Sequence, residues 1–266
     1  MTKAVARTWK TLFAGSIPKH AEFAANNEDC FIVSDEQQRY VVSDGASESF
    51  NSALWAKIVV ESWFNRRPAK NYLSWLRTVI DQYESQSDRA SMSWSQEAAF
   101  ERGSYASLLA CEVQPDSSVV ITALGDSLAV LVRDGRICES FPYQRAEQFN
   151  SRPTLLSTIQ TRNLTPMIVE GIRAFRRGEQ TGQCHAIWKP QPDHNWLILL
   201  MTDALGAWLL DDSDESSSRL DLLSKVSNEQ ELAALVEEAR TNGCMRRDDS
   251  TLIVLGDWGN ADFTTA

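Results

Sequence analysis

The sequence predicts an α+β fold in which antiparallel sheets are covered by helices. Strand-like runs are grouped with turns between them, and helix-like runs form separate groups, in place of a regular strand–helix alternation. The 266 residues are 43% hydrophobic and 23% charged, which is typical of a globular chain. We expect a single domain over residues 1–266, with a loop-rich insertion around 141–194.

The first half of the chain predicts a hairpin followed by helices and then more strands. Two β-branched and aromatic runs, 29–33 and 39–43, flank a polar turn and predict the hairpin. Ser47 or Ser49 would cap a helix that continues to about Phe64. Further expected elements are helices over 72–83 and 96–102 and strands over 104–113, 118–124 and 128–133.

The second half begins with the loop-rich insertion, because residues 141–194 contain five prolines and no clean periodicity. The acidic, serine-rich run 211–218 is interpreted as a solvated loop. Other expected elements are a strand over 197–202, a helix near 205–210, a helix that Asn228 caps and that continues through Arg240, and a strand over 250–255.

Charge and cysteine content narrow the classes of partner. Lys and Arg number 26 against 36 Asp and Glu, a formal net charge of -10, and such a surface repels the phosphate backbone of nucleic acids. The excess acid either keeps the protein in solution or is gathered to hold cations. No apolar run approaches the length of a spanning helix, and the five cysteines show no metal-ligand spacing. We expect a cytoplasmic protein with reduced thiols that binds neither nucleic acid nor membranes.

Acidic residues recur where predicted strands end. Asp and Asn favour turns and helix caps, so each acid taken singly has an ordinary structural explanation. If the acids converge, each pair ~4 Å apart repels by about 4 kcal/mol at an effective dielectric constant of 20, and divalent cations would relieve that repulsion. Oxygen ligands without His or Cys favour Mg²⁺ or Mn²⁺. The acidic segments are Asn27-Glu28-Asp29, Asp44-Gly45, Gly125-Asp126-Ser127, Asp203-Ala204 and Asp248-Asp249.

Six short motifs, in order along nearly the whole chain, resemble those of the protein phosphatase 2C (PPM) family of metal-dependent Ser/Thr phosphatases. Each motif alone is weak evidence, but six motifs in the family's order are a specific signal. The residues of these motifs are similar to those of the family's compact bacterial variants. The motifs are Asn27-Glu28-Asp29, Val42-Ser43-Asp44-Gly45-Ala46, Gly103-Ser104-Tyr105-Ala106, Ala123-Leu124-Gly125-Asp126-Ser127, Leu200-Met201-Thr202-Asp203-Ala204-Leu205 and Arg247-Asp248-Asp249-Ser250-Thr251-Leu252.

The resemblance implies a four-layer α/β/β/α sandwich of two antiparallel sheets flanked by helices, with two Mg²⁺ or Mn²⁺ ions at one end and a third, weaker metal position. It also implies that Asp29, Asp44, Asp203 and Asp248 are the catalytic acids. By similarity, Asp44 bridges the two metals, the Gly45 carbonyl binds one of them, Asp203 and Asp248 complete the other, Asp29 with Glu28 holds metal or its water, and Asp126 serves the third position.

The activity implied by the resemblance is hydrolysis of phosphoserine and phosphothreonine by a metal-activated water, with no cysteine nucleophile. Two cations would lower the pKa of the attacking water and neutralise charge on the phosphoryl oxygens. The implied partners are a phosphorylated protein substrate and a cognate Ser/Thr kinase.

One departure from the family pattern concerns substrate binding. The family has an arginine that clamps the substrate phosphate five residues before Asp29, and this chain has Ala24 there. Lys19 and His20 are the nearest basic residues and are the candidates to replace it. An alternative interpretation is that they are an exposed Lys and a packed His with no role in phosphate binding. An alternative function is therefore a weakly active or inactive phosphatase-like module that binds a phosphoprotein or regulates a kinase. A third reading is an acidic globular scaffold whose aspartates only form turns.

Overall fold

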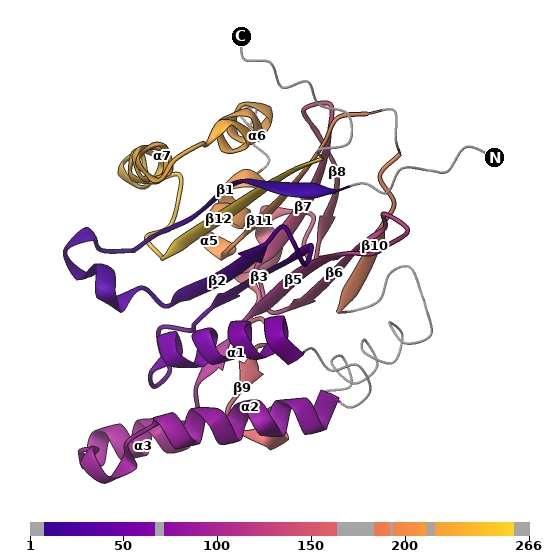
Figure 1. The fold of residues 1–266 in the computed structure, drawn as a ribbon. Helices are drawn as coiled ribbons and strands as arrows, with labels where there is room; N and C mark the ends of the chain where they lie inside the picture. The colour runs from indigo at the N-terminus through magenta and orange to yellow at the C-terminus, as the bar shows by residue number, and fades with distance from the viewer. Residues whose placement is uncertain (1–7, 67–71, 164–183, 192–193, 212–215, 258–266) are drawn as a thin grey trace.

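Two antiparallel sheets pack face to face, and helices cover both outer faces (Figure 1). The computed structural model describes residues 8–66, 72–163, 184–191, 194–211 and 216–257. This arrangement confirms the predicted α+β class and the four layers in the order helix, sheet, sheet, helix. Within the described ranges, no helix has the length and apolar character needed to cross a membrane.

The first sheet has β11 at its centre, with the C-terminal strand β12 beside it. Its order is β1-β12-β11-β7-β8, and every neighbouring pair is antiparallel. The bounds of its strands are β1 Trp9–Ile17, β7 Leu128–Arg133, β8 Arg136–Phe141, β11 Trp196–Met201 and β12 Ser250–Asp257.

The second sheet has the order β10-β6-β5-β3-β2 and is also antiparallel throughout. The predicted hairpin is confirmed, since Asp29 pairs with Asp44 at the open end of β2 and β3. The strands are β2 Asp29–Ser34, β3 Arg39–Asp44, β5 Leu108–Val113, β6 Val119–Leu124 and β10 His185–Trp188, and a separate short pair is formed by β4 Tyr105–Ala106 and β9 Leu156–Ser157.

Three helices lie on each outer face in the described part of the chain. The second sheet is covered by α1 Ser52–Arg66 and α2 Tyr72–Gln86, with α3 Trp94–Arg102 beside them. The first sheet is covered by α5 Asp203–Leu209, α6 Ser216–Lys225 and α7 Glu229–Thr241. The predicted cap of the last helix is confirmed, because the Asn228 side chain accepts a hydrogen bond from the Glu231 backbone.

The hydrophobic core has three parts, one between the sheets and one under each helical layer. The period of two along a strand assigns alternate residues to different parts. In β11, Ile198 and Leu200 face the other sheet, whereas Leu199 and Met201 pack against α5 and its neighbouring helices. A continuous apolar run such as β11 is therefore what a strand buried on both faces requires.

Three local expectations were wrong. Ser47 and Ser49 do not cap α1, which begins only at Ser52; their hydroxyls bond to Glu28 and to the Ala46 carbonyl. Residues 216–218 begin α6 instead of continuing a loop, while 212–215 lie outside the described residues. Strands β1 and β8 were not predicted. Both are edge strands whose partly exposed sequences mix polar and apolar residues, so their hydrophobic pattern is weak.

The segment predicted as a loop-rich insertion carries several short elements. Its described part contains β9, β10 and two 3₁₀ helices, η3 Ala146–Asn150 and η4 Gln160–Asn163, and residues 164–183 and 192–193 lie outside the described ranges. The extent of the insertion and the single domain over 1–266 stay predictions.

Candidate metal centre

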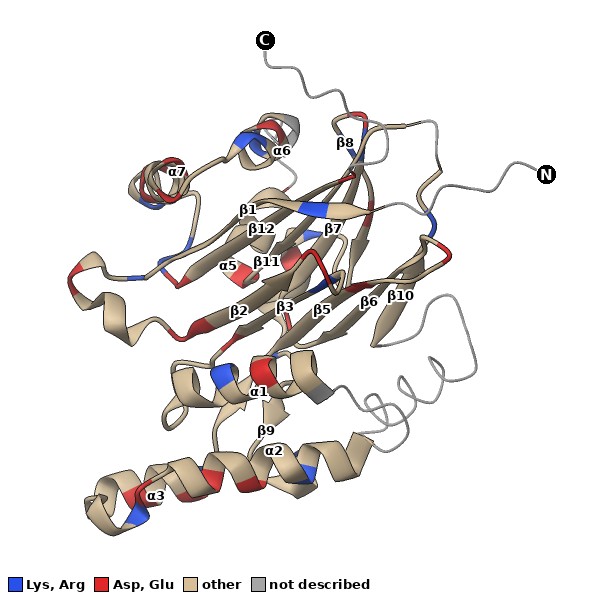
Figure 2. Cartoon of the chain, in the orientation of Figure 1, with Lys and Arg blue, Asp and Glu red and all other residues tan. Residues whose placement is uncertain are grey.

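The acidic segments singled out from the sequence all reach one edge of the sandwich. Neighbouring antiparallel strands alternately end and begin at the same edge, so β3 ends where β2 begins, and β11 ends where β12 begins. Asp126 lies in the connection that passes from β6 in the second sheet to β7 in the first. In Figure 2, acidic positions are red at the beginning of β2, in the second sheet, and at the beginning of α5, a helix that packs on the first sheet.

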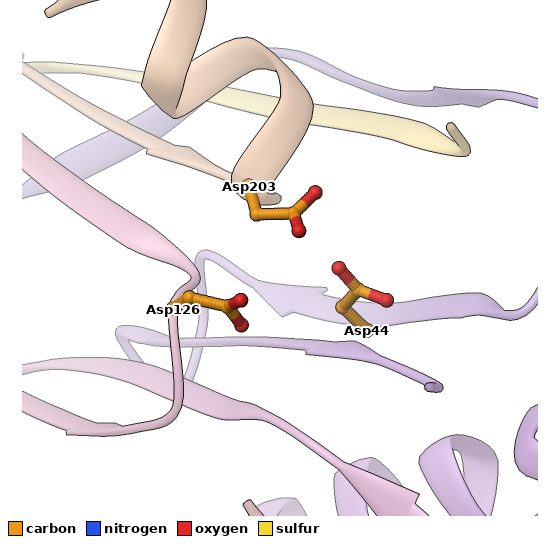
Figure 3. Close-up of side chains that lie close together, drawn as sticks. All are labelled: Asp44, Asp126 and Asp203. Atoms are coloured by element: carbon orange, nitrogen blue, oxygen red, sulfur yellow. The ribbon is translucent and has the colours of Figure 1, made fainter. Parts of the chain in front are cut away.

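Three aspartates converge closely enough to share a metal ion. One carboxylate oxygen each from Asp44, Asp126 and Asp203 lies within 4.8 Å of the other two. Figure 3 shows the three carboxylates pointing toward one another from the end of β3, the β6–β7 connection and the first residue of α5. Convergence is the property that motif spacing alone could not establish, and it weakens the reading of these acids as turn formers.

A buried serine fixes the backbone of Asp44. The Asp44 amide donates to the Ser107 hydroxyl (2.9 Å), and the Ser107 amide donates to the Asp44 carbonyl (2.8 Å). The Ser107 hydroxyl also lies 2.7 Å from that of Ser127, next to Asp126. Ser107 therefore ties two of the three acids together, and sequence reasoning missed it because the matched motif stops at Ala106.

Two glycines allow the close approach that this arrangement needs. A Cβ on Gly45 would lie 2.7 Å from the carbonyl oxygen of Ser52, so no larger residue fits between β3 and α1. Gly125 has φ +107°, and a Cβ there would lie 2.7 Å from the side chain of Ser107. Both positions require glycine for steric reasons, and each precedes or follows one of the converging aspartates.

Asp29 lies between the two sheets rather than in the group of three. Its Oδ2 accepts hydrogen bonds from the hydroxyls of Thr202 (3.0 Å), just after β11, and Thr251 (2.7 Å), in β12 of the opposite sheet. Its Oδ1 is buried and has no hydrogen-bond partner in the described residues. Burial raises the pKa of Asp29 to about 7, because the charged form loses its hydration.

The two aspartates before β12 have different surroundings. Burial is the main cause of a raised pKa at Asp248, and the charge of Asp248 in turn raises the pKa of both Asp44 and Asp126. Asp249 is buried, and its carboxylate accepts hydrogen bonds from the amides of Lys19 (2.7 Å) and Glu28 (2.8 Å). Asp248 therefore borders the group of three, whereas Asp249 holds the segment that precedes β2.

Glu28 and the two basic candidates lie at the rim. The Glu28 carboxylate accepts from the Lys19 ammonium and from the hydroxyls of Ser47 and Ser52, so its oxygens are already engaged within the protein. His20 is exposed and its ring packs edge-on against Phe23. Of the two residues proposed for phosphate binding, Lys19 is the one held against the segment that leads into the centre.

Arg246 is a basic residue at the centre that sequence reasoning missed. Its guanidinium forms an ion pair with the Asp203 carboxylate. The same positive charge lowers the pKa of Asp44, Asp126 and Asp248, opposing the effect of their burial. The only sequence signal was its position two residues before Asp248.

The donor set fits a hard divalent cation. Burial raises the pKa of Asp44 well above its ordinary value, and the neighbouring charges of Asp29 and Asp126 add to the rise. Oδ1 of Asp203 is buried without a hydrogen-bond partner in the part of the chain that the structure describes, as expected of an atom meant for another ligand. The group of three contains only carboxylate oxygens, which are the ligands that Mg²⁺ and Mn²⁺ prefer.

The overall architecture is similar to that of known phosphatases, although no family model matches the sequence and no curated protein matches it. The photosystem II phosphatase PBCP superposes with a TM-score of 0.56 at 15% identity, covering 95% of this chain and 100% of that one. Stp1, a serine/threonine phosphatase from Staphylococcus aureus, gives a TM-score of 0.52 at 20% identity, with 97% and 98% coverage. The PPM Ser-Thr phosphatase MsPP from Mycobacterium smegmatis gives 0.50 at 17% identity, with 92% and 98% coverage. The resemblance inferred from the six motifs is thereby confirmed at the level of the fold: this chain has the fold of the PPM-type phosphatases.

Proposed function

We propose that the protein is a metal-dependent phosphatase that hydrolyses phosphoserine and phosphothreonine in a protein substrate. The convergence of Asp44, Asp126 and Asp203 carries the proposal, because three buried or half-buried acids repel one another unless cations neutralise them. The similarity of the fold to phosphatases gives this acidic centre a reaction class. We also propose that the protein is cytoplasmic and that a Ser/Thr kinase phosphorylates its substrate.

In this proposal Asp44, Asp126, Asp203 and Asp248 hold Mg²⁺ or Mn²⁺, and the Gly45 carbonyl assists. The cations supply a lowered pKa for the attacking water and neutralise charge on the phosphoryl group. Two ions with a third, weaker position are proposed from the resemblance. None of the five cysteines forms a disulfide, and burial raises the pKa of the Cys30 thiol to about 11, which disfavours a thiolate nucleophile.

The protein's own residues have positioning roles in this account. Ser107 fixes the backbone of Asp44 relative to the turn that carries Asp126. Thr202 and Thr251 orient Asp29 between the sheets, where its second oxygen stays available to metal or to metal-held water. Lys19 is proposed to contact the substrate phosphate after leaving Glu28, with His20 as the weaker candidate.

The alternative proposal is a phosphoprotein-binding or kinase-regulating module with little catalysis. Ala24 favours it: this residue lies exposed in the 3₁₀ helix η1 Ala21–Asn26, where the family's phosphate-clamping arginine would be expected. A guanidinium bound to two phosphate oxygens contributes on the order of 1.5–3 kcal/mol, so its loss weakens binding more than it alters the acids.

Hydrolysis of an aryl phosphate in Mn²⁺, in Mg²⁺ and in EDTA separates these functions. The phosphatase proposal predicts turnover with either metal, none in EDTA, and loss of turnover in Asp44→Asn. A matched control variant is Asp257→Asn, which removes a carboxylate at the far end of β12. In thermal unfolding, Mn²⁺ should raise the Tm of this variant as much as it raises the Tm of the parent protein. A well-folded protein that binds phosphopeptide without turnover in any metal would support the alternative.

A further inference from the structure

A cavity borders the acidic centre, and three arginines line it. It has a volume of about 530 Å³ and is lined by Arg102 at the end of α3, Arg152 after η3, and Arg162 in η4. These three arginines, named here the arginine rim, come from separate elements. None of the three belongs to the six motifs or to the acidic centre.

The cavity is adjacent to the acidic centre on two sides. Ala46, which follows Gly45, lines it, and the Ala46 amide donates to the carbonyl of Tyr105, another lining residue. Leu155 also lines it and packs close to Gly125, the residue before Asp126, since a Cβ there would lie 3.0 Å from the Leu155 side chain. An extended chain whose phosphorylated residue enters the centre can therefore continue along this cavity.

The positive charges of the arginine rim stand out in a chain with a net charge of -10. Within the described ranges, none of the three arginines has a carboxylate partner: Arg102 donates to the Ala98 carbonyl (3.1 Å), and Arg162 donates to the Arg102 carbonyl (3.4 Å) and lies over the ring of Tyr105. Other arginines contrast with them, since Arg219 and Arg247 each pair with an acid. Among the described residues, Glu48 is the only acid that lines the cavity.

The floor between the arginines is formed mainly by apolar groups. Ala99, Pro153 and Leu155 contribute to it, and Tyr105 adds an aromatic ring. Arginines from three elements around a mainly apolar lining suit a peptide that offers several carboxylates to the arginines and packs its aliphatic side-chain stems against the apolar groups.

We propose that this cavity binds acidic residues that flank the phosphorylated Ser or Thr of the substrate. The inference rests on the proposed function for the identity of the substrate, and it assigns the substrate class as acidic phosphopeptides. Selectivity then comes from the arginine rim, while the acidic centre holds the cations. It also explains how binding strength is recovered in a chain that has Ala24 in place of an arginine.

Binding is measured by fluorescence anisotropy with a short phosphothreonine peptide flanked by Glu and a twin flanked by Gln. The measurement uses full-length Asp203→Asn in Mg²⁺, so that hydrolysis does not deplete the peptide. Because several exposed ion pairs add together, the Glu peptide should bind about tenfold more tightly than the Gln peptide. Adding salt should shrink that ratio because the rim is exposed.

The test variant combines Arg102→Gln, Arg152→Gln and Arg162→Gln, and should reduce the preference to within about twofold. The control combines Arg77→Gln, Arg133→Gln and Arg136→Gln, which removes the same charge from exposed positions outside the cavity. Glu48→Gln should increase the preference. Equal affinity for the two peptides in the parent, or equal loss in test and control variants, would overturn the proposal.

This design distinguishes failure of the inference from failure of the proposed function. Rim-dependent preference for the Glu peptide in a protein that never hydrolyses phosphate would retain the peptide site and reject the phosphatase. Hydrolysis of both peptides with identical kcat/KM in the protein and in the test variant would retain the phosphatase and reject the peptide site.

Discussion

Replacing Arg246 by Gln is expected to destabilise the metal-free protein and to strengthen its binding of Mn²⁺. Arg246 pairs with Asp203, and its charge also favours the ionised forms of Asp44 and Asp126. The guanidinium thus partly neutralises the acids when no metal is bound. The guanidinium repels a divalent cation that enters the same group of carboxylates, and the cation must displace the guanidinium from Asp203.

The magnitude follows from the exposure of the two partners. Exposed ion pairs contribute about 0.2–1 kcal/mol, and breaking a fully buried pair costs about 3–5 kcal/mol. The Asp203 side chain is 11% exposed but that of Arg246 is 43% exposed, so solvent screening places this pair near the lower range. A loss of about 1 kcal/mol corresponds to a fall in Tm of about 2 °C for a chain of this size. Removing about 1.4 kcal/mol of competition would lower the Kd for Mn²⁺ about tenfold.

The assay is thermal unfolding in EDTA and across a Mn²⁺ titration, with Arg247→Gln as the matched control. Arg247 is the next residue and loses the same charge, but its guanidinium pairs with Glu237 at 3.7 Å and donates to the Lys19 carbonyl, away from the acids. Arg247→Gln should leave the Mn²⁺ midpoint unchanged. The reasoning is refuted if Arg246→Gln weakens Mn²⁺ binding, or if it has the same Tm as the parent in EDTA and the same midpoint.

Three further predictions test neighbouring parts of the account. Ser107→Ala leaves the Asp44 amide without its buried acceptor, so it should cost about 1–3 kcal/mol of stability and weaken Mn²⁺ binding by calorimetry, whereas a purely structural role would leave Mn²⁺ affinity intact. Lys19→Gln should raise KM for a phosphopeptide about tenfold with little change in kcat, since it removes a charge-assisted contact to phosphate, and an equal effect from His20→Gln would show that Lys19 has no special place. Burial raises the pKa of the Cys30 and Cys184 thiols from 9.0 to about 11 and about 12, so above pH 9 the unfolded chain releases protons that the folded chain keeps. The free energy of unfolding should therefore fall between pH 9 and about 11, by at most about 1.4 kcal/mol per pH unit for each thiol, and Cys184→Ala should make this slope shallower in chemical denaturation.

Much of the fold could be predicted because the signals were local. Apolar residues alternate or run continuously in strands such as β3 and β11, and the pattern reports which faces are buried. Asn228 was recognised as a helix cap because the cap is a contact within four residues. Edge strands β1 and β8 were missed because they are partly exposed and mix polar with apolar residues, so their hydrophobic pattern is weak. Helix α6 was missed because its first turn is formed by serines.

The candidate site was predictable in its acids but not in its partners. Strand ends carried Asp44, Asp126 and Asp203, and an antiparallel arrangement brings strand ends to a common edge. The partners of Glu28 and Asp203 could not be predicted, since hydrogen bonds to Ser52 and ion pairs with Arg246 join residues whose proximity arises only from packing. Sequence order therefore identified which acids could bind metal, and the packed structure separates those that meet from those that hold neighbouring segments.

The central claim is that the converging aspartates hold the cations needed for phosphate hydrolysis. The most direct measurement is release of inorganic phosphate from a phosphothreonine peptide across a Mn²⁺ titration, for the parent protein and for Asp44→Asn. The account predicts saturable, Mn²⁺-dependent release by the parent that EDTA abolishes. In Asp44→Asn, kcat should fall by at least about a hundredfold at every Mn²⁺ concentration, since several kcal/mol of transition-state stabilisation are lost. Phosphate release that persists in EDTA, or that is equal in the two proteins, would contradict it.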